Sequence, residues 1–297
     1  MADIFLPPWR KKYLKEIQDL DAIKDHLRIA QIAVLYEFPW DVTRSLEVAL
    51  FRTFAVPSIS KILADSKQFE KHPQKRYDDT DLLLAEIVEY GYDSERGKKA
   101  IERMNFIHSH YPISQEDYLY VLSTFVFEPG KWIERFGYRQ LTEKEKIAAF
   151  TLWAEIGKRM GIQNIPSTLE EFRHFNETYE AKHFVYHDNN KKIATFTENL
   201  VLGWFLPPAL FEMARPFLLA VMDERLLTAF GHEKPNPIVQ TLVTTVLKTR
   251  GTLLSWLPAR KRPFLHTKQK TKTYPKGYGI DDLGPEKLNK HSTSGKR

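Results

Sequence analysis

Apolar residues recur at three- and four-residue spacing along most of this chain, and this spacing constrains the fold more than any other feature. Between residues 143 and 160 the apolar side chains that follow this period are Ile147, Phe150, Leu152, Trp153, Ile156 and Met160. An amphipathic α-helix produces such spacing, whereas a half-buried strand requires alternation with a period of two. No convincing run of that alternation occurs, so the sequence predicts an all-α fold.

Helix-end signals agree with this prediction. Thr142 with Glu145, and Ser167 with Glu170, have the spacing of the capping box that begins many helices. Gly161 follows the first of these segments and is expected to end its helix in a left-handed conformation. These residues predict one helix that starts after Thr142 and another that starts after Ser167.

The positive charge is concentrated near the C-terminus. The chain has a net charge of +6, and from Arg260 onward eleven Lys/Arg residues oppose three Asp/Glu, which gives +8 there and −2 for the rest. We expect a single large helical domain over residues 1–258 and an irregular, basic, partly disordered C-terminal tail over residues 259–297. A solvated tail is the simplest interpretation, and contact with anionic lipid or nucleic acid is the alternative.

The most apolar stretch, residues 200–222, is long enough to raise the question of a membrane span. Pro207 and Pro208 interrupt it, however, and Glu212 and Arg215 lie near its middle, where charges are costly in hydrocarbon. We therefore expect no transmembrane segment. A buried helix pair, or a helix that lies against a membrane surface, fits this composition better.

The chain contains no cysteine. This excludes disulfides, iron–sulfur clusters, thiolate-ligated haem and covalently attached c-type haem, so that any metal must be held by histidine or carboxylates. The missing cysteines fit a reducing compartment, and charges throughout the first twenty residues break up anything like a secretory signal. We expect an intracellular protein.

His108 is the strongest candidate metal ligand. A helical projection of residues 98–111 places His108 among the apolar side chains, and places His110 beside Lys99 and Arg103 on a face that water should reach. His108 is therefore either a core histidine that donates to a carbonyl group or a ligand. His110 is expected at the surface.

Arg76 and Thr80 are a second pair of candidates. They are four residues apart and share a helical face with Leu83 and Ile87, so the guanidinium of Arg76 is aimed toward apolar surroundings. A buried guanidinium is costly without an anion, and a haem propionate would serve as well as a side chain. The alternatives are an acidic partner elsewhere in the protein or a solvated position at the start of the helix.

Other patterns are less specific. His183 and His187, followed by Asp188, have a spacing that suits a metal site on one helical face, but their polar surroundings favour an exposed helix end. No dinucleotide-binding, P-loop, nucleophile-elbow or zincin signature is present.

The ordered set of these candidates resembles the haem b-dependent oxygenases of the MpaB and latex-clearing-protein (rubber oxygenase) family. Arg76 and Thr80 form an Arg-x-x-x-Thr motif, and His108 follows in a helix about thirty residues later. Three longer stretches are similar to the fungal MpaB-like branch, namely residues 104–146, 160–172 and 274–285. The resemblance covers most of the chain.

The resemblance implies an oxidoreductase with a haem pocket enclosed by helices. His108 would be the proximal ligand of the haem b iron, and Arg76 and Thr80 would hold or line the pocket. The substrates would be dioxygen and a hydrophobic, unsaturated or isoprenoid-like small molecule. Rubber-cleaving members carry a lysine directly before the motif threonine, where this chain has Asp79, so rubber itself is not expected as the substrate.

The alternative function is a non-catalytic helical protein that binds lipid or an anionic membrane surface. We expect the protein in the cytoplasm or peripherally at the endoplasmic reticulum, with peripheral membrane contact as a further expectation. A nucleic-acid partner is not expected, because the helical body is slightly acidic.

Overall fold

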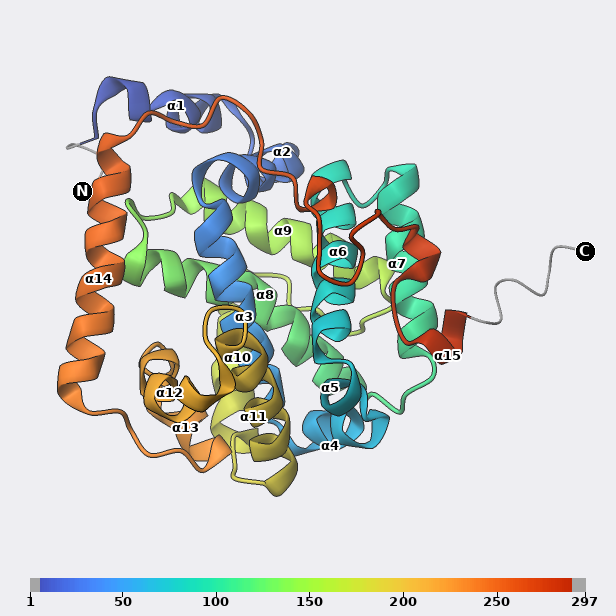
Figure 1. Ribbon diagram of the computed structural model, residues 1–297. Helices are drawn as coiled ribbons and strands as arrows, with labels where there is room; N and C mark the ends of the chain where they lie inside the picture. Colours follow the sequence, from blue (N-terminus) through green and yellow to red (C-terminus); the bar gives the residue numbers. More distant parts are fainter. Residues whose placement is uncertain (1–5, 290–297) are drawn as a thin grey trace, which may run out of the picture.

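The computed structural model describes residues 6–289, and every regular element in that range is helical (Figure 1), which confirms the all-α class. The α-helices are α1 (Lys12–Asp19), α2 (His26–Gln31), α3 (Pro39–Phe54), α4 (Pro57–Ser66), α5 (Gln68–Lys71), α6 (Pro73–Tyr90), α7 (Glu95–His108), α8 (Gln115–Phe136), α9 (Glu143–Arg159), α10 (Leu169–His183), α11 (Asp188–Leu202), α12 (Phe211–Leu219), α13 (Glu224–Phe230), α14 (Pro237–Trp256) and α15 (Glu286–Asn289). Short helical turns join them, namely η2 (Pro8–Arg10), η3 (Ile32–Glu37), η4 (Pro208–Leu210), η5 (His266–Lys268) and η6 (Ile280–Asp282).

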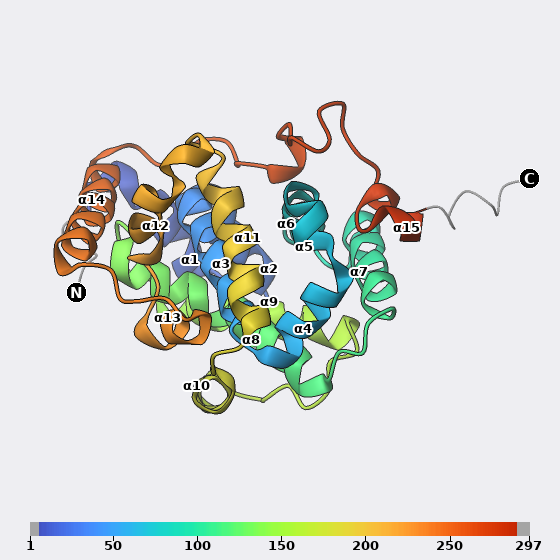
Figure 2. The same cartoon turned by 60° about the horizontal axis from the view of Figure 1, so that its bottom comes forward.

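Helices α8 and α9 run through the middle of the molecule, and the other helices pack around them (Figure 1). α3 packs along α8, α2 packs on α9, and α6 forms a pair with α7 on one side. The largest apolar cluster is built by buried side chains of α6, α7, α8 and α9, and a second cluster joins α3, α11 and α13. Figure 2 shows α10 and α13 on the face that lies at the bottom of Figure 1.

The first predicted helix start is confirmed, and the second lies one residue later than predicted. Thr142 and Glu145 form the expected capping box of α9. At α10 the cap is Thr168 with Glu171, rather than Ser167 with Glu170. The carboxylate of Glu171 also accepts hydrogen bonds from the backbone and hydroxyl of Ser167, so both hydroxyl residues precede the helix and the one nearer to it becomes the cap.

The apolar stretch at residues 200–222 is divided among several short elements. α11 ends at Leu202, a turn through η4 follows, and α12 occupies Phe211–Leu219. None of the helices within residues 6–289 combines the length and the apolar character that a membrane crossing requires. The two prolines therefore lie between the helices: α11 has already ended at Leu202, and Pro208 begins the η4 turn that leads into α12.

Residues 259–289 return across the molecule and pack on α6 and α7 (Figure 1). Tyr278, for example, donates a hydrogen bond of 2.6 Å to the carboxylate of Glu86 on α6. This packing differs from the solvated tail expected for residues 259–297, because aromatic side chains in this segment find buried acceptors on the domain. Residues 290–297 of that expected tail lie outside the described residues.

The same packing corrects the expected position of Arg103. The helical projection placed Arg103 on a wet face of α7, but its side chain is buried, and its Nε donates to the Leu283 carbonyl oxygen at 2.7 Å. Lys99 remains half-exposed and pairs with Asp281 at 2.7 Å. The C-terminal segment thus covers a face that a helical projection of α7 alone would leave in solvent.

Gly97, in the first turn of α7, touches the turn that follows α6. A Cβ atom on Gly97 would lie 2.0 Å from the carbonyl oxygen of Gly91 and 2.9 Å from the Cα of Tyr92. Because both neighbours are backbone atoms, Gly97→Ala is expected to push α7 away from α6 and to lower the free energy of unfolding by about 1–3 kcal/mol. Denaturant unfolding measures this loss.

The matched control is Gly130→Ala in α8, since a Cβ at Gly130 meets nothing within 4 Å. Replacing a helical glycine by alanine in open space is expected to stabilise the protein by about 0.5–1 kcal/mol. Equal stability of the two alanine variants would contradict the close approach of α7 to α6.

Candidate functional site

The three residues predicted to form the site lie together around one cavity of about 210 Å³. Arg76 and Thr80 reach it from α6, and His108 reaches it from the last position of α7. The remaining walls come mainly from apolar side chains of α3, α4, α8 and α9, among them Phe54, Leu63, Val121, Phe125 and Ile156. The α6–α7 pair therefore places one imidazole and one guanidinium in a largely apolar chamber.

His108 has no hydrogen-bond partner in this chamber. Its Nδ1 atom is fully buried without a partner, and neither ring nitrogen is hydrogen-bonded to any residue within 6–289. Its ring packs edge-on against Tyr118, with centroids 5.6 Å apart. Burial, and then the nearby charge of Arg76, lower the pKa of His108 to about 4. His108 is therefore a neutral imidazole at neutral pH, and it does not donate to a carbonyl as a core histidine would.

His110 lies outside the chamber. It is exposed, and its Nδ1 lies 2.8 Å from the Phe106 carbonyl oxygen one turn earlier. The structure thus separates the two histidines as the helical projection predicted: His108 faces the cavity and His110 faces solvent.

Arg76 has no acidic partner among the described residues. Its guanidinium donates to the hydroxyl of Thr80 and lies 5.6 Å from the ring centre of Phe69. Burial lowers the pKa of Arg76 while the charge of Asp79 opposes that shift, and a guanidinium stays protonated even so. The side chain is thus a cation that lines an apolar cavity without forming an ion pair within residues 6–289. Arg76 therefore matches neither of the two alternatives expected from the sequence, an arginine paired with an acidic side chain or an arginine exposed to solvent.

Asp79, the residue before Thr80, also lines the cavity. Its carboxylate accepts hydrogen bonds from Lys75 at 2.9 Å and from the hydroxyl of Tyr274 at 2.6 Å. Burial raises the pKa of Asp79, and its two donors counteract that shift. Asp79 therefore ties the C-terminal segment to α6.

The C-terminal segment also supplies part of the cavity wall, which the sequence did not predict. Gly284 and Pro285 line the cavity beside His108, and Lys75 donates to the Gly284 carbonyl oxygen at 2.9 Å. The similarity of residues 274–285 to the fungal branch was the only sequence signal for this segment. It gave no indication that the segment reaches the site.

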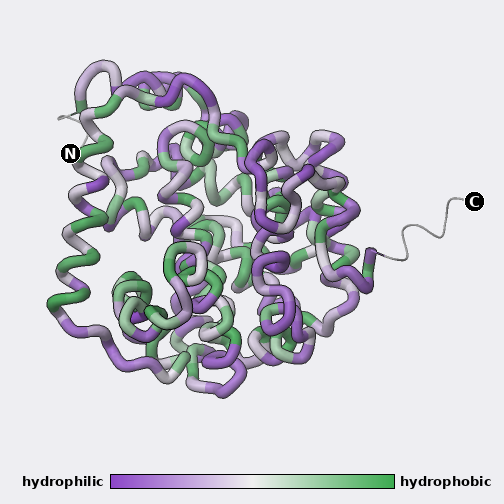
Figure 3. The backbone as a smooth tube through the Cα atoms, viewed as in Figure 1, coloured by the Kyte–Doolittle hydropathy of each residue, from purple (hydrophilic) through white to green (hydrophobic). Residues whose placement is uncertain are grey.

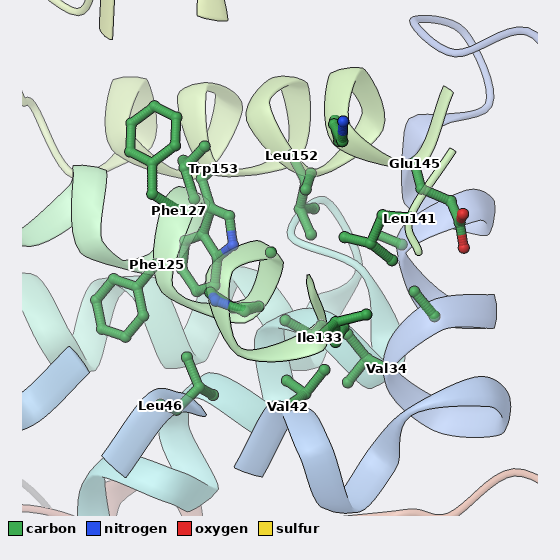
Figure 4. Close-up of a pocket in the computed structure, with 18 of the residues that line it drawn as sticks. Val34, Val42, Leu46, Phe125, Phe127, Ile133, Leu141, Glu145, Leu152 and Trp153 are labelled. Atoms are coloured by element: carbon green, nitrogen blue, oxygen red, sulfur yellow. The ribbon is translucent and has the colours of Figure 1, made fainter. Parts of the chain in front are cut away.

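A second cavity, also of about 210 Å³, lies on the other side of a shared wall. Leu84, Phe125 and Trp153 line both cavities, and the rings of Phe125 and Trp153 stack with centroids 4.6 Å apart. Figure 4 shows this second cavity, with apolar side chains such as Val42 and Ile133 pointing into it. Two cavities therefore adjoin, with three side chains common to their walls, and the lining of the second also includes charged side chains such as Asp81, Glu89 and Lys131.

The first cavity has the features that a haem group requires. An unpartnered neutral imidazole is the form of histidine that ligates iron, and an unpaired arginine is a suitable partner for a propionate. The apolar walls match the macrocycle, which is itself apolar. The residues present therefore fit a b-type haem on three separate grounds.

His183 and His187 lie at helix ends, away from this cavity. His183 is the last residue of α10, and His187 caps α11 by accepting a hydrogen bond of 3.1 Å from the backbone of Asn189. Across residues 6–289 no three His, Asp or Glu side chains come close enough together to hold a metal ion. His187 thus caps the start of α11, and His183 stacks on Tyr179 with ring centroids 4.2 Å apart.

Comparison with known proteins gives a match over most of the helical domain. The family model described as "ER-bound oxygenase mpaB/B'/Rubber oxygenase, catalytic domain" matches residues 40–236. The chain is 33% identical over 275 residues to the ER-bound oxygenase mpaB' of Penicillium brevicompactum. The match covers 86% of this chain and 64% of that protein, so the chain spans just under two thirds of that relative's length. It is 32% identical over 243 residues to the ER-bound oxygenase mpaB of Penicillium roqueforti (strain FM164), covering 76% of this chain and 80% of that protein.

A solved structure has the same fold. The structure of latex clearing protein LCP in the closed state superposes with a TM-score of 0.54 at 13% sequence identity, over 87% of this chain and 76% of that one. At this identity the likeness concerns the arrangement of helices alone.

Proposed function

The chain belongs to the family of MpaB-type ER-bound oxygenases and rubber oxygenases, and on this basis we propose that it is a haem b-dependent oxygenase of a hydrophobic small molecule. The single observation that carries the haem part is the unpartnered, neutral imidazole of His108, buried at an apolar cavity. The family membership supports the oxygenase part.

In this proposal three residues hold the cofactor. His108 would bind the haem iron, Arg76 would pair with a propionate, and Thr80 would orient the Arg76 guanidinium through the hydrogen bond between them. A haem held there by one imidazole would supply the chemistry that activates dioxygen. The neutral state of His108 matters, because a protonated imidazole has no lone pair to offer the iron.

The walls of the cavity have a role of their own. Aliphatic and aromatic side chains exclude water, which protects reactive species from side reactions and favours an apolar substrate. Asp79, Lys75 and Tyr274 keep the C-terminal segment closed over this wall. These residues therefore contribute by enclosing the site.

The second cavity supports a substrate with a long apolar part. Aliphatic and aromatic side chains such as Val34, Val42 and Ile133 form one part of its wall, and it adjoins the first cavity at Phe125 and Trp153. We place the unsaturated or isoprenoid-like portion of the substrate there, next to the haem cavity. Asp79 in place of the lysine of rubber-cleaving members argues against rubber as this substrate.

The competing proposal is a non-catalytic binding protein that uses these cavities for lipid. The support for this proposal is Asp79. Its carboxylate accepts hydrogen bonds from Lys75 and Tyr274, so residue 79 offers the cavity neither a free base nor a cation that could take part in a reaction. Haem content and oxygen chemistry distinguish the two proposals.

Expression with added haem tests the proposal directly. The purified protein is expected to contain about one b-type haem per chain, measured by its Soret band and by pyridine haemochrome. The reduced protein is expected to consume oxygen when an unsaturated apolar compound is added, and to do so much more slowly with the saturated analogue. A protein that folds without binding haem, or binds haem without any substrate-dependent oxygen uptake, would favour the binding protein.

The proposal includes peripheral contact with a membrane. The fungal relatives are called ER-bound, and we place this protein at the surface of the endoplasmic reticulum, where apolar substrates concentrate. Dioxygen and the apolar substrate are its expected small-molecule partners.

A further inference from the structure

Helix α14 exposes most of its apolar side chains to solvent. Of its twenty residues only Gly251 is buried. Along its outer face Ile238, Leu242, Val246, Leu253 and Trp256 are between 50% and 76% exposed. Monomeric soluble proteins rarely expose contiguous apolar patches larger than a few hundred Å², and larger ones mark interaction sites.

The helix lies along one edge of the molecule, where its apolar face is open. Figure 1 shows α14 as the outermost helix on that side, and Figure 3 shows that its outer edge is largely hydrophobic. α12 packs beside it and adds the exposed side chains of Met213 and Phe217. The cation on its inner side, Arg250, pairs with Asp41 at 2.9 Å and so is turned toward the domain.

Two parts of the chain bring basic residues to the C-terminal end of α14. The indole of Trp9 donates to the Trp256 carbonyl oxygen at 3.3 Å, and the hydroxyl of Tyr13 donates to the Arg260 carbonyl oxygen at 2.6 Å. These bonds hold six cationic side chains close to the end of the helix, namely Lys11, Lys12, Lys15, Arg260, Lys261 and Arg262. None of the six forms an ion pair within the described part of the chain. We call them the basic cluster.

The stretch that carries Arg260, Lys261 and Arg262 has charge of one sign. From Pro235 to Ile280 the sequence contains no Asp or Glu, while it contains nine Lys and Arg residues. Glu224 and Glu233 lie near the opposite, N-terminal end of α14. Any attraction to an anionic partner is therefore strongest where Trp9 and Trp256 are exposed.

We propose that the exposed apolar face of α14, together with the basic cluster, docks on a membrane surface that contains anionic phospholipid. The inference rests on the membrane contact in the proposed function and adds to it the surface and the lipid class. Helices that lie in the membrane interface combine an apolar face with Lys and Arg, and two exposed tryptophans beside them suit the headgroup region. The unpaired positive charge favours a lipid surface over a second copy of this chain, whose own cluster would repel it.

The geometry fixes an orientation. The outer face of α14 enters the boundary between headgroups and acyl chains, while Arg250 and its partner Asp41 remain on the protein side. The basic cluster then meets lipid phosphates at one end of the helix. Binding is expected to weaken as salt is added, because the attraction of the cluster is screened.

Vesicle sedimentation with the full chain tests this docking surface. The wild type is expected to bind phosphatidylcholine vesicles containing phosphatidylserine at least about tenfold more tightly than vesicles of phosphatidylcholine alone. The apolar variant Leu242→Gln/Val246→Gln/Leu253→Gln is expected to lose most binding to both. Glutamine keeps good helix propensity at these exposed positions, so the variant is expected to fold.

The charge variant is Arg260→Gln/Lys261→Gln/Arg262→Gln, and it is expected to lose the preference for phosphatidylserine. Its matched control is Lys98→Gln/Lys182→Gln/Lys191→Gln, which removes the same charge from exposed lysines without ion pairs in the described chain. The control is expected to keep the wild-type preference. Circular dichroism checks that all variants are folded.

Several outcomes would overturn the inference. The wild type fails to bind either vesicle, or the apolar variant and the control bind equally well, or gel filtration shows a dimer that the apolar variant abolishes. That last result would make the α14 face an interface between two copies. Haem content in the same samples separates this inference from the oxygenase proposal, because the α14 variants lie outside the haem cavity and are expected to retain full haem occupancy.

Discussion

Replacing His108 with alanine is expected to abolish stable haem binding while leaving the helical fold intact. In the proposed site His108 supplies the protein's bond to the iron, and loss of even an outer-shell partner of a metal ligand lowers metal affinity about 10- to 100-fold. We therefore expect haem occupancy to fall by more than about a hundredfold at limiting haem. The height of the Soret band per chain measures the loss.

His110→Ala is the matched control, since it removes an imidazole two residues away from a solvent-exposed position. This variant is expected to keep the wild-type spectrum. Added imidazole is expected to restore part of the Soret band of His108→Ala, which a merely misfolded variant would not show. Loss of haem in the His110 variant alone would contradict the assignment of His108.

The second large effect is expected at Arg139, whose side chain is fully buried between two carboxylates. It forms ion pairs with Glu37 at 3.0 Å and with Glu145 at 2.7 Å. Glu145 also belongs to the capping box that starts α9. Arg139→Met keeps the length of the side chain but leaves both buried acids without a cation, and breaking a buried pair in this way costs about 3–5 kcal/mol.

Denaturant unfolding of the haem-free protein measures this change. Arg159→Met is the control, because Arg159 pairs with Asp93 and Glu155 near the surface, where ion pairs contribute about 1 kcal/mol or less. Since domains are stable by only about 5–15 kcal/mol, the Arg139 variant loses a large share of its stability. Similar losses in both variants would show that the buried network contributes no more than a surface pair.

Local patterns predicted much of the fold and the placement of the site residues. The helical period, the capping box at Thr142 and the left-handed Gly161 depend on residues close in sequence, and the structure confirms each of them. The contrast between His108 and His110 follows from the same period, because each residue of an α-helix is rotated by a fixed angle from the one before it. Arg76 reaches the cavity for the same reason.

Contacts between segments far apart in the chain could not be predicted from the sequence patterns. Arg103 donates a hydrogen bond to the backbone carbonyl of Leu283, 180 residues away, and Tyr274 donates one to Asp79, 195 residues away. The spacing of residues within either segment does not indicate which distant segment it will contact. The composition of the C-terminal segment, rich in lysine, predicted solvation, whereas its tyrosines determine where it packs.

The packing of Tyr274–Pro285 over α6 has a consequence for the order of assembly in the cell. Gly284 and Pro285 complete the wall beside His108, so the chamber remains open until the ribosome has synthesised almost the whole described chain. Under the proposed function, the haem would have to enter before or while this last segment docks, because docking completes the wall that encloses it. Closure of the cavity is in this sense a late event of synthesis, and a nascent chain halted before residue 274 would present an open, largely apolar cavity to chaperones.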